Sequence, residues 1–470
     1  MRTMPETAAA SQTNETSAHF RTIIIGILAA TGGLMSGLDI GVISGALDFV
    51  ADTFKASTFA QEWIVSAMMA GAAIGAVLAG WLARISGRKW ALVGGGVIFV
   101  LGSLACAFAW SVSTMIAGRA LMGLAIGIAA FTSPLYLSEI ASENTRGAMI
   151  STYQLMITVG IFLAFISDTL FSYHGQWRWM FGVIAIPGVL FVIGVLFLPY
   201  SPRWLMMQGR REEALTVLKD LRPTPHEAHA EIRAIDEQLQ QRQGGFSLLL
   251  KNANFRRSIL LGILLQVMQQ FAGINVVMYY APKIFALAGF VGTAQMWCTA
   301  MIGFVNVLAT LAAIGLVDRW GRKPILYCGF SIMTVAMGAL AVLNHVGMDS
   351  QAAKVLCVFL IMIFIVAHAM SAGPLMWVLC SEIQPIKGRD LGITFSTLTN
   401  WVSNMIVGAS FLSILGWLGG AKTFGLMGLL NALFFVLTYV FVPETKGVSL
   451  EVIEQNLMAG KKLRDIGQKV

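Results

Sequence analysis

Long apolar runs separated by short polar loops dominate the chain. Each run has about the 20 residues that a helix needs to cross a bilayer. A polypeptide inside lipid must satisfy its backbone hydrogen bonds within a helix or a closed barrel. Twelve runs lie near residues 22–43, 63–83, 90–110, 115–137, 150–171, 180–198, 258–280, 295–317, 325–344, 354–380, 392–416 and 422–442. The pattern predicts an all-α membrane protein with twelve transmembrane helices.

A polar segment divides these runs into six and six. Its apolar positions recur at helical spacing, as in Leu215, Leu218 and Leu221, which predicts short amphipathic helices on the water side of the membrane. We therefore expect a cytoplasmic tail at 1–20, a six-helix bundle at 21–198, a cytoplasmic linker at 199–257, a second six-helix bundle at 258–443 and a cytoplasmic tail at 444–470.

Composition and charge agree with a membrane protein. Hydrophobic residues make up 57% of the chain and charged residues 12%, whereas soluble domains carry about 25% charged residues. With the N-terminus inside, 26 of the 32 lysines and arginines fall on the inner side and five on the outer side. This bias predicts that both termini are cytoplasmic. Because the basic excess is spread over alternate loops, it argues against nucleic acid as a partner. The five cysteines form no CxxC pair, so we expect no metal site, disulfide framework or cofactor.

Short strings recur at matching places in the two halves. Parallel repeats of six helices predict two pseudo-symmetric bundles that rock about a site near the membrane midplane. Glutamates and arginines at the helix ends could clamp the cytoplasmic face in one conformation and separate in the other; alternatively, they only fix the topology. The repeated strings are Gly87-Arg88-Lys89 and Gly321-Arg322-Lys323, Ser138-Glu139-Ile140 with Arg146 and Ser381-Glu382-Ile383 with Arg389, and Pro199-x-Ser201 and Pro443-x-Thr445.

Two charged residues lie inside predicted spans of the first half. Asp39 is in the first span, and Arg119 is the basic residue within the fourth. A charge near the bilayer centre costs roughly 2.5–3.5 kcal/mol on insertion scales, so the two side chains are expected to pair. A carboxyl group with a breakable partner can load and release a proton. We predict that Asp39 and Arg119 couple transport to protons; the alternative is a structural ion pair.

Carboxamide side chains gather in the seventh span. Gln266, Gln269 and Gln270 share one helix face, and Gly273 permits a helix break that could bring Asn275 back to that face. Discontinuous helices often mark transporter sites, and carboxamides both donate and accept hydrogen bonds, which suits neutral hydroxyl-rich ligands. Packing between helices is the alternative role. Further polar or aromatic positions inside spans are Gln154, Asn306, Asn400 and Trp377, the last directly after a predicted break at Gly373-Pro374.

These strings, with Gln269-Gln270-Phe271-x-Gly273-Ile274-Asn275 and Gly373-Pro374-x-x-Trp377, resemble the sugar porter family of the major facilitator superfamily. The resemblance covers the chain from about Gly32 to Lys446 and is strongest to bacterial galactose–proton and arabinose–proton symporters. It implies that Asp39 carries the proton, since passive members tend to have Asn there. The sugar-site positions that it implies are Gln154, Gln269, Gln270, Asn275, Asn306, Trp377 and Asn400.

Five positions mark further roles or departures. Tyr279 and Tyr280 look like an outer gate, with an interfacial anchor as the alternative. Ser36 stands where close relatives have Phe, which could enlarge or weaken the pocket, and Tyr200 replaces the usual acidic residue of the Pro-x-Ser-Pro-Arg string. His368, in the tenth predicted span before Gly373-Pro374, is expected to be packed rather than functional, with titration of its imidazole as the alternative role.

The sequence therefore predicts a secondary transporter of the bacterial inner membrane, not an enzyme. It would import a galactose-, glucose- or arabinose-like monosaccharide with a proton and function as a monomer. A passive facilitator and a non-transporting sugar sensor are the alternatives. Asp39 argues against the facilitator, and the short tail after Lys446 argues against the sensor. Motifs of metalloproteases, hydrolases or nucleotide-binding enzymes were not found.

Overall fold

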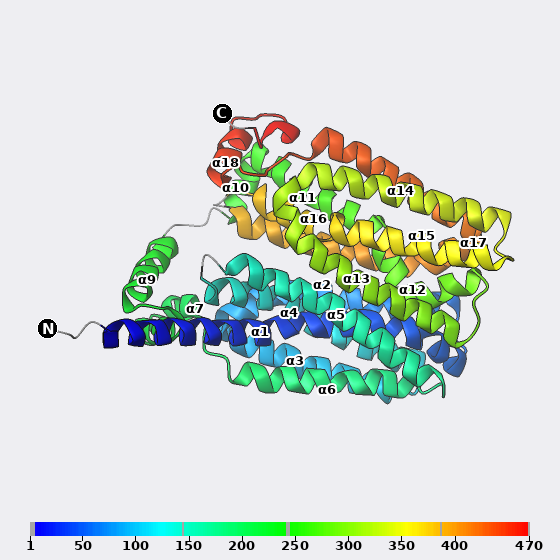
Figure 1. The fold of residues 1–470 in the computed structure, drawn as a ribbon, viewed down its shortest axis with the longest axis horizontal. Coiled ribbons are helices and arrows are strands. Elements are labelled where there is room, and N and C mark those ends of the chain that lie inside the picture. Colours follow the sequence, from blue (N-terminus) through cyan, green and yellow to red (C-terminus); the bar gives the residue numbers. More distant parts are fainter. Residues whose placement is uncertain (1–4, 143–144, 241–244, 386–387, 469–470) are drawn as a thin grey trace.

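The computed structural model describes residues 5–142, 145–240, 245–385 and 388–468. Its long helices run side by side in two groups, with the first half of the chain below the second in Figure 1. The first half consists of α1 (Pro5–Phe54), α2 (Thr58–Ile85), α3 (Gly87–Ala107), α4 (Val112–Ile140), α5 (Arg146–Ser172) and α6 (Trp177–Leu196).

In the second half, two spans are each broken into two helices, and the last two spans together form one long helical segment. It consists of α11 (Ala253–Phe271), α12 (Ile274–Leu287), α13 (Thr293–Trp320), α14 (Arg322–Val346), α15 (Gln351–Met370), α16 (Ala372–Glu382) and α17 (Arg389–Phe441). Eleven helical segments of the described residues are long and apolar enough to cross a membrane. Because α17 turns at Gly419, where φ is 76° and ψ 166°, it supplies two spans. The predicted twelve-helix, six-plus-six architecture is confirmed.

The linker folds into the predicted short helices, α7 (Pro202–Met207), α8 (Arg211–Leu221), α9 (Pro225–Gln240) and α10 (Gly245–Lys251). Trp204, Leu218 and Ile232 belong to a small apolar core made of linker residues. After the last span, α18 (Leu450–Met458) and a short 3-10 helix (Leu463–Asp465) complete the chain.

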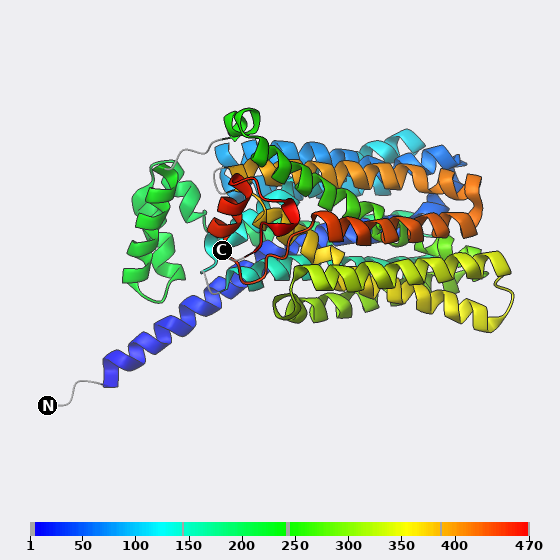
Figure 2. The ribbon, with the colours of Figure 1, turned by 90° about the horizontal axis from the view of Figure 1, so that it is seen from above.

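Two helix boundaries differ from the sequence prediction. The first helix begins at Pro5, so most of the expected tail is helical, and Figure 2 shows α1 extending beyond the bundle. The second half begins at Ala253 rather than 258, because the side chain of Asn252 caps α11 by accepting hydrogen bonds from the backbone N–H groups of Asn254 and Phe255. Hydropathy misses such polar first turns.

Both termini, the linker helices and α18 lie at one end of the molecule, here called the linker end (Figure 1). The opposite end, where α1 ends at Phe54 and α12 at Leu287, is called the far end. Within the first half, α1 packs on α5 and α2 on α4 at glycines. A Cβ atom at Gly37 would overlap the Ile157 carbonyl oxygen, and one at Gly123 would overlap that of Met68. Close backbone approach at small residues is the usual way in which membrane helices associate.

The two halves meet along three helix pairs: α2 with α17, α5 with α13, and α1 with α12. The hydrogen bonds and ion pairs between described residues that join the halves lie toward the far end. Lys283 of α12 contacts Asp48 at 2.7 Å and Gln61 at 2.9 Å, and Thr169 of α5 donates to the Met296 carbonyl at 3.3 Å. In this structure the halves are therefore tied together at the far end.

Candidate functional site

Asp39 and Arg119 form an ion pair in the interior of the first half. Asp39 lies near the middle of the apolar stretch Phe20–Phe54 of α1, and Nη1 of Arg119 on α4 donates to its Oδ1. Arg119 Nε donates to the Ile64 carbonyl of α2 at 3.2 Å. Both charged side chains are fully buried, so the predicted pairing is confirmed. Asp39 Oδ2 and Arg119 Nη2 have no hydrogen-bond partner among the described residues, which leaves one oxygen of the carboxylate available.

The seventh span breaks at Gly273, as the sequence predicts. Gly273 has φ 101°, a left-handed conformation that glycine adopts without a steric penalty. The break turns Asn275 back toward the preceding helix, and its Nδ2 donates to Gln270 Oε1 at 2.5 Å. Nδ2 of Asn431 donates to the Ala272 carbonyl at 3.1 Å, which satisfies a backbone group next to the break.

Asn400 of α17 joins the glutamine face of α11. Its Nδ2 donates to Gln266 Oε1 at 2.6 Å and to Gln269 Oε1 at 2.8 Å. Gln269 Nε2 in turn donates to the Ala372 and Gly373 carbonyls at 3.2 and 2.8 Å. Three carboxamides therefore form a buried network where α11, α16 and α17 meet. Each amide retains bonding capacity for a ligand hydroxyl.

The tenth span also breaks, but not at the predicted position. The backbone leaves the helix at Ser371 (φ −127°, ψ −92°), and α16 begins at Ala372. Gly373 and Pro374 thus lie in the first turn of the new helix instead of forming the break. Proline is tolerated there because first-turn N–H groups have no partner within the helix. His368, next to this break, is buried, and its Nε2 has no hydrogen-bond partner among the described residues.

Tyr279 and Tyr280 are both fully buried and bonded to α17. The Tyr279 hydroxyl accepts from Asn404 Nδ2 at 3.1 Å. The Tyr280 hydroxyl donates to the Gly408 carbonyl at 2.7 Å, and its ring stacks on Phe411 at a centroid distance of 5.2 Å. Full burial excludes the interfacial-anchor role in this conformation. Their role as a gate stays a prediction.

The other predicted sugar-site residues lie on α5, α13 and α16. Gln154 on α5 is half-buried, Asn306 on α13 is buried, and Trp377 on α16 is 37% exposed. No hydrogen bond between described residues connects these three side chains to the network. Ser36 is buried, and its hydroxyl donates to the Gly32 carbonyl of its own helix at 3.5 Å.

The repeated charged strings form equivalent clusters at the linker end of each half. Arg88 donates to both oxygens of Glu139 at 2.7 and 2.8 Å, and Ser201 Oγ donates to Glu139 at 2.5 Å. In the second half Glu382 accepts from Arg322 at 3.0 Å and from Thr445 Oγ1 at 2.5 Å. The internal repeat relates the two clusters, including the hydroxyl donor, which is Ser201 in the first half and Thr445 in the second.

Each of these clusters connects helices within one half. The sequence analysis suggested glutamate–arginine contacts that clamp the cytoplasmic face in one conformation. The arginines that pair with Glu139 and Glu382 are Arg88 and Arg322. The Arg146 side chain lies outside the described residues, and Nε and Nη2 of Arg389 have no partner among those described. A latch between the halves that uses Arg146 or Arg389 stays a prediction.

Position 200 distinguishes the two clusters. In the second half, Glu444 accepts from the backbone N–H groups of Arg322 and Lys323 at 3.1 and 2.9 Å. Tyr200 takes the matching place in the first half. Its hydroxyl accepts from Trp90 Nε1 at 3.0 Å, and Lys89 lies 5.4 Å from its ring centroid. The Tyr200 ring therefore attracts the Lys89 ammonium group of the Gly87-Arg88-Lys89 string by a cation–π interaction.

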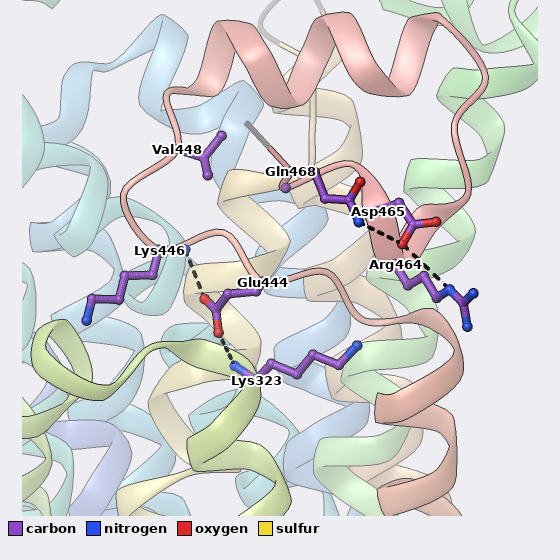
Figure 3. A pocket seen from close by; sticks show the side chains of 8 residues that line it. Lys323, Glu444, Lys446, Val448, Arg464, Asp465 and Gln468 are labelled. Carbon is purple, nitrogen blue, oxygen red and sulfur yellow. Dashed lines mark hydrogen bonds and ion pairs between the residues drawn. The ribbon is translucent and has the colours of Figure 1, made fainter. Parts of the chain in front are cut away.

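A surface pocket at the linker end surrounds Glu444 and the C-terminal segment (Figure 3). Lys323, Lys446 and Arg464 line it together with Glu444 and Asp465. Both acids are already engaged, Glu444 with backbone N–H groups and Asp465 with Arg464 at 3.6 Å. The pocket lies outside the bundle interior, and we assign it to anchoring of the tail.

The sequence analysis did not identify two buried acidic residues. Glu62 of α2 is hydrogen-bonded to Ser413 of α17 across the α2–α17 seam, the contact between these helices of the two halves. Asp168 of α5 is 1% exposed, and neither of its oxygens has a partner among the described residues. Both lie close to the ends of their spans, where a charged residue carries no signal that separates it from a loop.

Two six-helix halves with broken helices and a buried acid–base pair define a transporter of the major facilitator fold. The profile of the "Sugar (and other) transporter" family matches residues 25–457, and the chain belongs to this family.

The chain is 56% identical to the galactose–proton symporter of Escherichia coli (strain K12), over 99% of both chains. It is 53% identical to the arabinose–proton symporter of the same organism, over 95% of both. Among solved structures, the partially occluded inward-open xylose transporter XylE from E. coli matches with a TM-score of 0.81 and 27% identity, over 91% of this chain and 99% of that one. The proton:xylose symporter XylE bound to 6-bromo-6-deoxy-D-glucose matches with a TM-score of 0.77 and 26% identity, over 95% and 98%.

Proposed function

We propose that this protein imports a monosaccharide together with a proton by alternating access. The observation that carries the proposal is the Asp39–Arg119 pair, buried in the interior of the first half. Such a pair is costly in lipid. It can serve proton transport, because a proton can replace the arginine as the partner of the carboxylate. The relatives named as galactose–proton and arabinose–proton symporters support the same function.

The sugar site is proposed at the break of the seventh span. Gln269, Gln270, Asn275 and Asn400 present carboxamides there, already oriented by one another. A monosaccharide hydroxyl both donates and accepts, so it can replace amide–amide bonds by amide–hydroxyl bonds at little net cost. We propose that Gln154, Asn306 and Trp377 line further walls of this site, and expect the indole of Trp377 to stack on the apolar face of the sugar ring. A galactose-, glucose- or arabinose-like sugar fits this chemistry.

We further propose that the linker end faces the cytoplasm of a bacterium and that the protein works as a monomer in the inner membrane. The excess of Lys and Arg on that side supports the orientation. The bonds between the halves at the far end then correspond to a conformation closed toward the outside. The likeness to inward-open XylE supports this assignment.

External pH in de-energised cells that express the protein tests the function. Galactose, glucose, arabinose and xylose are added in turn, and labelled-sugar entry is measured in parallel. Alkalinisation with one sugar is expected, because its entry removes protons from the medium. Sugar entry without alkalinisation would instead support the passive facilitator, and no entry of any of the four sugars would overturn the assignment of the substrate class.

A further inference from the structure

Glu62 makes a buried contact between the two halves at the far end. It lies in the second turn of α2 and is 1% exposed. Its Oε1 accepts from the backbone N–H of Ser413 on α17 at 2.6 Å, and its Oε2 accepts from the Ser413 hydroxyl at 2.7 Å. Both oxygens of one carboxyl group from the first half are therefore bound by one residue of the second half.

The far-end contacts of Lys283 with Asp48 and of Thr169 with Met296 are weaker candidates for holding the halves together. The Lys283–Asp48 pair has side chains that are 26% and 43% exposed, and exposed ion pairs contribute little because water and salt screen them. The Thr169 hydroxyl divides its bonding between the Phe165 and Met296 carbonyls. The Glu62–Ser413 contact, in contrast, consists of two hydrogen bonds to one carboxyl group that is 1% exposed, and hydrogen bonds to charged groups contribute more than neutral ones.

These two bonds exist only while α2 and α17 touch at the far end. When the halves separate there, water replaces the partners of both Glu62 and the Ser413 hydroxyl, so the two bonds between these residues are made only in the closed state. Their free energy therefore enters the equilibrium between the two conformations directly. We propose that Glu62 is a positioning residue of the transport cycle, which stabilises the state closed at the far end by binding the N–H and O–H groups of Ser413. The proposal rests on the alternating-access function proposed above.

Two substitutions weaken this contact to different extents. Glu62→Gln keeps the shape of the side chain but has a single acceptor oxygen, which can serve the Ser413 N–H. Its Nε2 can only donate, so the Ser413 hydroxyl must turn to accept, and the substitution should favour separation. Ser413→Ala removes only the hydroxyl and should have a smaller effect in the same direction. Ser410→Ala, one turn earlier on α17, is the matched control, because the Ser410 hydroxyl donates to the Ile406 carbonyl of its own helix at 2.7 Å.

Distances between spin labels measure the equilibrium without sugar or a proton gradient. In a variant whose five cysteines are replaced by serine, labels at T58C and W417C report the far end of the α2–α17 seam. Labels at G147C and G315C report the linker end of α5 and α13, where an added Cβ meets no neighbour. We expect Glu62→Gln to raise the ratio of open to closed far ends about tenfold, because hydrogen bonds to a carboxylate contribute more than those to a neutral amide. The linker-end labels should move closer together in the same proportion.

Three outcomes decide the proposal. Unchanged far-end distances in both Glu62→Gln and Ser413→Ala would overturn it. An equal shift in Ser410→Ala would also overturn it, because general loosening of α17 would then explain the change. If Glu62→Gln does not fold, as judged by size-exclusion chromatography, Ser413→Ala alone decides between these results. Since no substrate is present, a failed proposal here leaves the alkalinisation result for sugar–proton symport unaffected.

Discussion

Asn275 and Gln270 lie on opposite sides of a helix break and are hydrogen-bonded, with 2.5 Å between Asn275 Nδ2 and Gln270 Oε1. On a continuous helix, residues five apart point in different directions. The left-handed backbone of Gly273 makes the contact possible. The geometry of the proposed sugar site therefore depends on one residue without a side chain.

Gly273→Ala should distort this site. A left-handed conformation is strained for alanine, and its Cβ would also overlap the Met427 side chain. We expect a loss of roughly 1–3 kcal/mol of stability and weaker sugar binding, measured by thermal unfolding and calorimetric titration. Gly338→Ala in α14 is the matched control, since its Cβ would meet nothing and a mid-helix alanine stabilises by about 0.5–1 kcal/mol. Equal melting temperatures for the two variants would contradict the argument.

Removal of Arg119 alone should be more harmful than removal of the pair. Arg119→Leu leaves Asp39 buried without its cation, which typically costs about 3–5 kcal/mol. The double variant Asp39→Asn/Arg119→Leu carries no buried charge at this place and should recover much of that loss. Thermal unfolding of the purified variants measures both. A double variant less stable than Arg119→Leu would mean that the pair is not the main interaction of these side chains.

Asp39→Asn should separate sugar movement from proton movement. The amide keeps the shape of the carboxyl group and can still accept a bond from Arg119, but it cannot take up a proton. We expect sugar equilibration to persist, while accumulation against a gradient and alkalinisation disappear. Asp168→Asn is the matched control, because Asp168 is also buried in the first half but has no hydrogen-bond partner among the described residues. Continued accumulation by Asp39→Asn would refute proton coupling through this residue.

Asn400→Ala should weaken sugar binding more than it weakens the fold. The substitution removes the donor that orients both Gln266 and Gln269. We expect a rise in Kd of about tenfold or more, as for the loss of one or two buried hydrogen bonds. Asn344→Ala serves as the control, since Asn344 donates to the Leu340 carbonyl of its own helix. An unchanged Kd in Asn400→Ala would place the sugar elsewhere.

The sequence by itself determined the twelve spans, the division into two halves, the pairing of Asp39 with Arg119 and the break at Gly273. In a bilayer these features depend on short stretches of sequence. Each span needs a fixed apolar length, and a charge inside lipid needs a partner. A glycine beside polar side chains indicates a helix break. Such requirements can be read without knowing which helices touch.

Only the tertiary structure decided which of several similar groups meet. Asn400 could have faced many polar side chains, yet α17 places it against Gln266 and Gln269. Glu139 bonds Arg88, while the sequence offered Arg146 as well. The tenth span breaks at Ser371 and not at Gly373-Pro374. The closed far end and the Glu62–Ser413 contact belong to one of two packings that differ by a few kcal/mol. That difference arises from contacts between residues hundreds of positions apart, which no local pattern encodes.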